Sequence, residues 1–177
     1  MRIISGDFKG RRVLGNKKFN ARPTTDFARE SLFNILNNYF YFDELRVLDI
    51  FSGTGSISME FASRGCTKLE LVELDSKNFK MIADAVTQLN MNHIRMVRGD
   101  AFKYLDTCIP GYDIIFADPP FDMKGVELLP EKIFGRNLLT EKGWFVLEHS
   151  KQYHFQEHVN FKEERTYGAV HFSIFKK

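Results

Sequence analysis

The chain has 177 residues, 44% of them hydrophobic and 18 of them phenylalanine, which is enough apolar material for one buried core. Its net charge of +2 hides an asymmetry, because residues 1–25 hold seven basic side chains and one acid while the remainder is mildly acidic. The sequence has no apolar run long enough to span a bilayer, no signal-peptide pattern and no cysteine spacing typical of a zinc site. We therefore expect a cytoplasmic protein without a membrane span or a metal site.

The first predicted element is a short basic β-hairpin. The segments RIISG and KGRRVL flank a turn between Gly6 and Gly10, which predicts two short strands. We assign residues 1–22 to this extension and residues 23–177 to the main domain. Lys and Arg replace counterions along phosphates, so a basic arm on an acidic body suits a polyanion-binding enzyme, although a merely solvated terminus fits the charge equally well.

A helix is predicted next, beginning at the start signals Pro23, Thr24, Thr25 and Asp26. After that point, residues that share one face recur at helical spacing. They are Phe27, Ala28, Ser31, Leu32, Ile35, Leu36 and Tyr39.

From residue 46 onward, short apolar strands alternate with helices. We predict strands at 46–51, 68–74, 94–99, 112–117 and 144–149, and helices at 56–64, 76–90, 101–107 and 124–135. This alternation favours an α/β fold with a doubly wound, Rossmann-like parallel sheet. The last two segments, 160–167 and 170–177, flank Gly168 without a helix between them, which predicts a hairpin and therefore an antiparallel strand.

Candidate cofactor-binding residues follow three successive strands. The first strand ends in a glycine turn, where the backbone can turn tightly and approach a ligand closely. The second ends in Glu73, 18 residues beyond Gly55 and near the roughly 20 typical of a carboxylate that binds ribose hydroxyls. The third ends in Asp100, which is placed to bond an adenine amino group. The expected site consists of Asp49, Phe51, Ser52, Gly53, Thr54, Gly55, Glu73, Leu74, Asp100 and Ala101.

The residue types around this turn favour S-adenosylmethionine over a nicotinamide cofactor. A dinucleotide site needs a third glycine that brings the helix N-terminus to a pyrophosphate, and Ser58 stands there instead. Asp49 would also repel a phosphate, whereas it suits a cationic sulfonium and an ammonium group. An NAD-dependent oxidoreductase is therefore disfavoured.

A rigid loop after the fourth strand carries the candidate catalytic residues Asp118, Pro119, Pro120 and Phe121. The prolines restrict the backbone and hold Asp118 in an extended conformation. An exocyclic amine is a poor nucleophile, and acceptance of its two N–H bonds by the Asp118 carboxylate and the Pro119 carbonyl would aim its lone pair at a methyl donor. Phe121 is expected to stack on a base that is flipped out or already unpaired.

These motifs resemble those of the amino-methylating class I methyltransferases, and within that class the chain is most similar to the RsmD family of 16S ribosomal RNA guanine-N2 methyltransferases. The resemblance rests on RIISGDFKGRRV, on the segment from Arg22 to Asn34, and on DIFSGTG, VELD and DPPF. It implies a seven-stranded sheet with a reversed last hairpin, a monomer, and the small ribosomal subunit or its RNA as the partner. It also implies that Arg22 and Thr24 line the substrate cleft and that the basic hairpin, with Lys9, Arg11 and Arg12, reads part of the RNA.

Several alternatives stay open at this point. The DPPF loop does not separate guanine from adenine N6, cytosine N4 or a protein glutamine. A non-catalytic RNA-binding protein could keep this fold, although the retained Asp118 with both prolines argues against it. We interpret His149, His154 and His158 as solvated side chains, and Arg64 as an ordinary surface charge.

Overall fold

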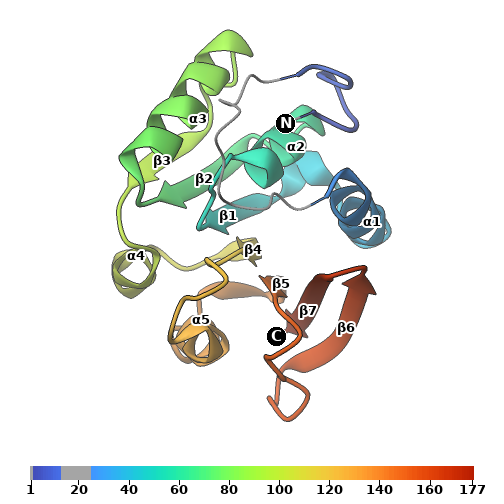
Figure 1. Cartoon of the computed structure of the whole chain (residues 1–177), viewed down its shortest axis with the longest axis vertical. Helices are drawn as coiled ribbons and strands as arrows, with labels where there is room; N and C mark the ends of the chain where they lie inside the picture. The colour runs from blue at the N-terminus through green and yellow to red at the C-terminus, as the bar shows by residue number, and fades with distance from the viewer. Residues whose placement is uncertain (1, 13–24) are drawn as a thin grey trace.

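The computed structural model describes residues 2–12 and 25–177, and Figure 1 shows a central sheet with helices on both faces. The helices are α1 (Asp26–Asn37), α2 (Ser56–Ser63), α3 (Ser76–Gln88), α4 (Ala101–Thr107) and α5 (Leu129–Gly135), with 3-10 turns η1 (Phe42–Glu44) and η2 (Val126–Leu128). The strands are β1 (Arg46–Ile50), β2 (Lys68–Glu73), β3 (Arg95–Arg98), β4 (Tyr112–Ala117), β5 (Leu139–His149), β6 (Phe161–Tyr167) and β7 (Val170–Lys176).

The sheet has seven strands in the order β3-β2-β1-β4-β5-β7-β6. Strands β1 to β5 pair in parallel, and β7 pairs antiparallel with both β5 and β6. This arrangement confirms the predicted doubly wound sheet with a reversed last hairpin. The chain winds outward in both directions from β1 and β4, so the carboxyl ends of these two strands diverge into loops at one edge.

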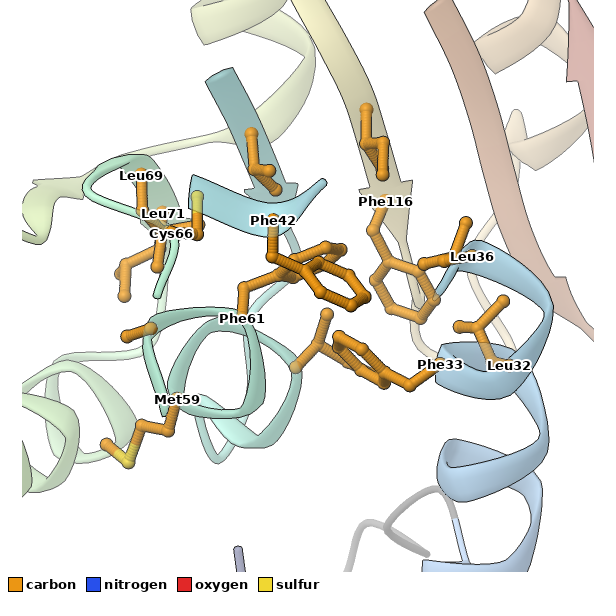
Figure 2. Packing of buried hydrophobic residues seen from close by; sticks show 14 of the residues in the cluster. Leu32, Phe33, Leu36, Phe42, Met59, Phe61, Cys66, Leu69, Leu71 and Phe116 are labelled. Carbon is orange, nitrogen blue, oxygen red and sulfur yellow. The ribbon is translucent and has the colours of Figure 1, made fainter. Parts of the chain in front are cut away.

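Both faces of the sheet are buried, which explains why its strands read as nearly continuous apolar runs. One core packs α1, α2 and α3 against the sheet, and the other packs α4 and α5 against the opposite face. Figure 2 shows the aromatic centre of the first core, where the rings of Phe33 and Phe61 lie 4.6 Å apart and Phe42 packs against both. Aromatic pairs in such tilted geometry stabilise a core beyond the area that they bury.

The buried face of α1 differs from the predicted one. The side chain of Phe27 is 68% exposed and that of Tyr39 is 62% exposed, although both were placed on the same face as Leu32. Arg29 and Phe33 are buried instead. The helix is oriented so that Phe33 lies in the aromatic centre. The spacing of apolar residues in the sequence allowed two overlapping faces of α1 to be buried, and it could not show which of them packs on the sheet.

From residue 46 onward, two elements differ from their predicted bounds by more than two residues. Strand β5 begins at Leu139, which pairs with Tyr112 before a bulge shifts the register to Ile114 opposite Trp144. The predicted helix at 124–135 divides into η2 and α5, with Pro130 in the first turn of α5, a position where proline is favoured.

In place of the two predicted strands, the described part of the N-terminal hairpin has one antiparallel bridge, between Arg2 and Arg12. Its turn is docked on the C-terminal half of α2 rather than extended into solvent. Gly6 has φ +78°, and a Cβ there would lie 1.8 Å from the carbonyl oxygen of Ser63, so only glycine fits this contact. The N–H of Asp7 donates to the same carbonyl over 2.8 Å.

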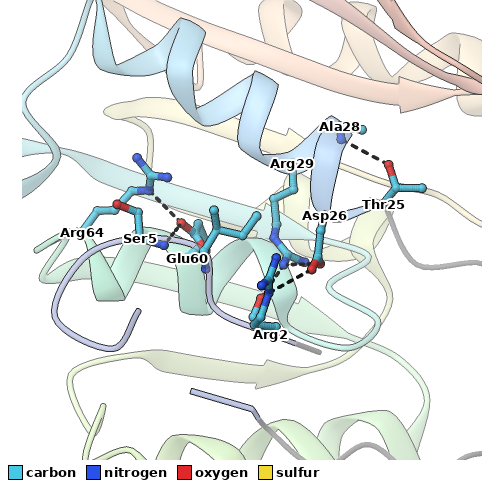
Figure 3. A network of polar contacts seen from close by, with 9 residues as sticks. Arg2, Ser5, Thr25, Asp26, Ala28, Arg29, Glu60 and Arg64 are labelled. Atoms are coloured by element: carbon cyan, nitrogen blue, oxygen red, sulfur yellow. Dashed lines mark hydrogen bonds and ion pairs between the residues drawn. The ribbon is translucent and has the colours of Figure 1, made fainter. Parts of the chain in front are cut away.

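A buried carboxylate fastens this turn to the main domain (Figure 3). Glu60 of α2 is 1% exposed and accepts hydrogen bonds from the backbone N–H groups of Ile4 (2.8 Å) and Ser5 (3.0 Å). It also accepts one from Nε of Arg64 (2.9 Å), whose guanidinium lies 4.8 Å from the ring centre of Phe33. Arg64 is therefore part of a buried network, and its interpretation as a surface charge was wrong.

Candidate functional site

The candidate site lies at the carboxyl edge of the sheet, where the loops after β1 and β4 separate. The first loop turns through residues with positive φ: Phe51 (61°), Gly53 (54°) and Gly55 (71°). A Cβ on Gly55 would lie 3.1 Å from the side chain of Ile82, so this glycine also permits close packing between α2 and α3. A Cβ on Gly53 would meet just one atom within 4 Å, at 3.8 Å, so its face is open to a ligand.

Asp49, at the end of β1, is buried and directed at the first turn of α2. Its Oδ2 accepts hydrogen bonds from the backbone N–H of Ser58 (3.2 Å) and from the Ser58 hydroxyl (2.5 Å). Burial raises the pKa of Asp49 to about 7 despite these bonds, and repulsion from Glu73 adds to the rise. The carboxylate thus occupies the end of the helix where a dinucleotide phosphate would bind.

Glu73, at the end of β2, joins the glycine turn to the neighbouring strand. One of its oxygens accepts from the N–H of Gly53 (2.6 Å) and the other from the N–H of Asp75 (2.7 Å). The side chain is 7% exposed. A carboxylate has about four acceptor positions, so these two bonds orient Glu73 and leave capacity for hydroxyl donors.

Asp100 and the residues that follow it form the third part of the candidate cofactor site, after β3. Asp100 caps α4 by accepting from the N–H of Lys103 (2.9 Å), and the neighbouring Ala101 is buried. Phe102 packs edge-on against Phe51, with 6.2 Å between ring centres. The sequence analysis did not include Phe102 among the cofactor-binding residues, although its position directly after Asp100 and Ala101 could have indicated that role. The other residues predicted here are the buried Ser52, the half-buried Thr54 and Leu74, which is 64% exposed.

The loop after β4 brings a second carboxylate to the same edge. Asp118 is half-buried, and its pKa is raised well above the usual value by burial and by the nearby charges of Glu148 and Asp49. Pro119 is half-buried, Pro120 is exposed, and the ring of Phe121 is 76% exposed.

Strand β5 supports this loop with residues that the sequence analysis did not single out. Leu147 pairs with Ala117, so Glu148 stands beside Asp118 in the next row of the sheet. Beyond β5, the hydroxyl of Tyr153 donates to the carbonyl of Met123 over 3.0 Å, and the Met123 N–H donates to Pro120 over 2.9 Å. The sequence could have indicated Glu148, because it stands next to the last residue of β5 as Asp49 does in β1.

The remaining predicted residues are less closely tied to the edge. Lys9, Arg11 and Arg12 are exposed on the docked N-terminal hairpin, whereas Arg22 and Thr24 lie outside the described residues. His149 is 7% exposed and bonded to the Ser173 hydroxyl (2.8 Å), so its interpretation as a solvated side chain was wrong.

The described residues, 2–12 and 25–177, show neither a metal cluster nor a membrane-spanning helix. Within these ranges, no three His, Cys, Asp or Glu side chains are grouped as a metal ion would require. The same ranges contain no helix with the length and apolar character to cross a membrane.

Comparisons with known proteins relate the whole chain to one family. A family model described as "Conserved hypothetical protein 95" matches residues 1–176. Bacillus subtilis YlbH is 33% identical over 184 residues, covering 100% of this chain and 99% of that protein. The Escherichia coli ribosomal RNA small subunit methyltransferase D is 34% identical over 148 residues, covering 84% and 71% respectively.

Solved structures have the same fold. Escherichia coli yhhF is 26% identical with a TM-score of 0.87, over 100% of this chain and 97% of that one. A Thermus thermophilus hypothetical protein is 25% identical with a TM-score of 0.87, over 100% and 99%. SMU.776, solved in complex with SAH, is 17% identical with a TM-score of 0.67 over 84% of this chain and 49% of that one, and shares the fold.

Proposed function

Because this chain belongs to the RsmD family, described as Conserved hypothetical protein 95, we propose that it methylates the exocyclic N2 amine of a guanine in 16S ribosomal RNA. Family membership makes the chain a methyltransferase that uses S-adenosylmethionine. The base, the atom and the small-subunit substrate are the proposed part. The observation that carries the proposal is the placement of Asp118 and the open ring of Phe121 at the same sheet edge as the glycine turn.

The described residues fit a cationic cofactor that lacks a phosphate. Asp49 already takes the N–H of Ser58 at the start of α2, so a pyrophosphate would meet a carboxylate there. Burial raises the pKa of Asp49, repulsion from Glu73 adds to the rise, and a nearby positive charge would relieve that repulsion. S-adenosylmethionine brings both a sulfonium and an ammonium group.

We assign the cofactor contacts as follows. Glu73 would accept the ribose hydroxyls, because its two backbone bonds fix its orientation beside the open face of Gly53. Asp100 would accept the adenine amino group. Phe51 and Phe102 would pack against the adenine ring, since their own edge-on contact holds an apolar surface next to Asp100.

Asp118 and the Pro119 carbonyl would bind the two hydrogens of the target amine. The bound cofactor supplies an electrophilic methyl group, and these acceptors direct the nitrogen lone pair toward it while they stabilise the positive charge that develops on nitrogen. In such a transfer the amine nitrogen would gain the methyl group that the sulfonium loses, and the nitrogen would then release a proton. The Asp118 carboxylate is the acceptor for that proton, and burial beside Glu148 makes it a better base than an exposed aspartate.

RNA binding in this proposal combines charge and stacking. Phe121 is 76% exposed beside Asp118 and would stack on the guanine once it is unpaired. The extension at residues 1–22 would contact phosphates, with Lys9, Arg11 and Arg12 exposed on its described part. Arg22 and Thr24 remain proposed cleft residues on the strength of the family resemblance.

A labelling experiment tests the substrate. The protein is incubated with methyl-labelled S-adenosylmethionine and small ribosomal subunits that lack the modification, and the RNA is digested to nucleosides. We expect the label in N2-methylguanosine. Label in N6-methyladenosine, in N4-methylcytidine or in a protein would overturn the assignment of the base.

Two variants test the catalytic loop. Asp118→Asn should keep the affinity for S-adenosylmethionine, measured by calorimetry, but lose most turnover, because an amide offers one acceptor and no base. Asp122→Asn changes the same chemical group at an exposed position four residues further on and should leave turnover unchanged. Equal turnover in both variants would refute the role of Asp118.

A further inference from the structure

An exposed aromatic pair lies outside the site described above. Phe27, in the first turn of α1, is 68% exposed, and its ring meets that of Tyr167 edge-on at 5.9 Å. Tyr167 is the last residue of β6 and packs on the buried Phe172 of β7, with 6.1 Å between ring centres. Tyr167 is fixed by its packing on the core and in turn supports Phe27 at the surface. The two rings together form an apolar surface, which we call the ledge.

The sheet register places this ledge on the substrate side of the molecule. Ala117, Leu147, Ser173 and Glu164 form one row across β4, β5, β7 and β6. Asp118 lies one residue beyond this row, and Tyr167 lies three residues beyond it in the same direction, because β6 runs parallel to β4. Three strand spacings separate β4 from β6, about 14 Å across the sheet. Figure 1 shows the end of β6 beside the start of α1.

The charges around the ledge favour a polyanion over an apolar protein surface. Arg2 bonds to Asp26, the neighbour of Phe27, over 3.2 Å, and the Arg2 side chain is 54% exposed. Arg29 also bonds to Asp26 over 2.9 Å, so this acid is neutralised from two sides. Through its bridge to Arg2, the exposed Arg12 belongs to the same surface.

We propose that Phe27 and Tyr167 form a stacking platform for an unpaired base of the RNA substrate, a few nucleotides away from the base held at Asp118. This inference rests on the proposed function and adds a second contact point to it. Every base has an aromatic face, so a ring platform next to basic side chains binds single-stranded RNA without reading its sequence. With one base bound at Asp118 and a second base on this platform, the RNA backbone between them would cross the sheet edge in one fixed direction.

Steady-state kinetics with small ribosomal subunits as the substrate distinguish a role in RNA binding from a role in catalysis. Phe27→Ala should lower kcat/KM for the RNA substrate by about 5-fold to 150-fold, the range measured for loss of one base–aromatic stack, mainly through KM. Phe27→Trp should restore it, and calorimetric affinity for S-adenosylmethionine should not change. Tyr167→Leu keeps apolar packing on Phe172 and should still weaken RNA binding. The matched control is Tyr41→Ala, which removes a ring that is 78% exposed just before η1 and β1, at the opposite edge of the sheet.

A fluorescence experiment measures the binding of a base at the platform directly. In Phe27→Trp the new indole is exposed, whereas the native Trp144 is 4% exposed, so a change in emission reports the new position. A short single-stranded oligouridylate, whose bases are largely unstacked, should quench this emission, and a duplex of the same length should not, because its bases are already stacked.

The outcomes distinguish the two proposals. If the wild type labels no RNA, the proposed function fails, while quenching of Phe27→Trp still tests the platform. If the wild type labels RNA but Phe27→Ala matches Tyr41→Ala in kcat/KM, or if duplex and single strand quench equally, the platform is refuted and the methylation stands. A loss in kcat alone would also refute it.

Discussion

Acidification should weaken S-adenosylmethionine binding through Asp49. This carboxyl is buried at the end of β1, and burial raises its pKa to about 7 even though Ser58 donates two hydrogen bonds to it. A cationic ligand favours the ionised form, so binding lowers this pKa. The favourable interaction is therefore present above pH 7 and is lost as the pH falls through that value.

The size of the effect follows from the titration. At about pH 6 an acid with a pKa of about 7 is roughly nine-tenths protonated, and at about pH 8 it is nearly all ionised. If the cation binds only beside the ionised form, Kd should rise roughly tenfold between these two conditions, or about 1.4 kcal/mol.

Calorimetry with two ligands isolates this contribution. S-adenosylhomocysteine lacks the sulfonium charge, so its affinity should change much less over the same range. Asp49→Asn should flatten the profile of S-adenosylmethionine, whereas Asp84→Asn, an exposed change on α3, should keep it. Equal slopes for the two ligands would place the charge interaction at the ammonium group that both share, whereas an unchanged pH profile in Asp49→Asn, or tighter binding of S-adenosylmethionine at low pH, would show that Asp49 does not act through its charge.

The same variant should behave oppositely in stability. An acid whose pKa is raised by folding costs stability above its unfolded pKa, so the ionised Asp49 destabilises the ligand-free fold at about pH 8. Asp49→Asn should therefore raise the midpoint of urea unfolding at that pH while it weakens cofactor binding. A lowered midpoint would mean that the hydrogen bonds to Ser58 outweigh the desolvation of the charge.

Three further changes probe the framework of the site. Glu60→Ala leaves two backbone N–H groups and an arginine without their buried acceptor and should cost about 3–5 kcal/mol of unfolding free energy, whereas the exposed Glu157→Ala should cost almost nothing in the same urea titration. Gly6→Ala should release the N-terminal turn from α2, seen as faster amide hydrogen exchange there, and unchanged exchange would contradict the docking. Tyr153→Phe removes a hydroxyl bond to the catalytic loop and should lower kcat roughly two- to tenfold with little change in cofactor affinity; an unaltered kcat would show that the bond does not position the loop.

From residue 46 onward, the sequence alone predicted the order of strands and helices and the sheet edge where the candidate residues meet. Hydrophobic period, glycine turns and helix start signals are local properties, so the strands around Asp49 and Ala117 and a helix start within residues 23–26 were readable without tertiary information. Parallel strands end at a common edge, and for this reason the sequence alone allowed Glu73 and Asp100 to be grouped with Asp49.

Only the tertiary structure decided which side chains share an environment. Phe27 and Phe33 have the same intrinsic hydrophobicity, but one is exposed and the other is buried, because the aromatic centre selects the face of α1. Arg64 is half-buried against the ring of Phe33, His149 is buried against Ser173, and Glu148 reached Asp118 through strand pairing. Burial and nearby charge then determine the pKa of a carboxyl, and both are sums over neighbours that lie far apart in the chain.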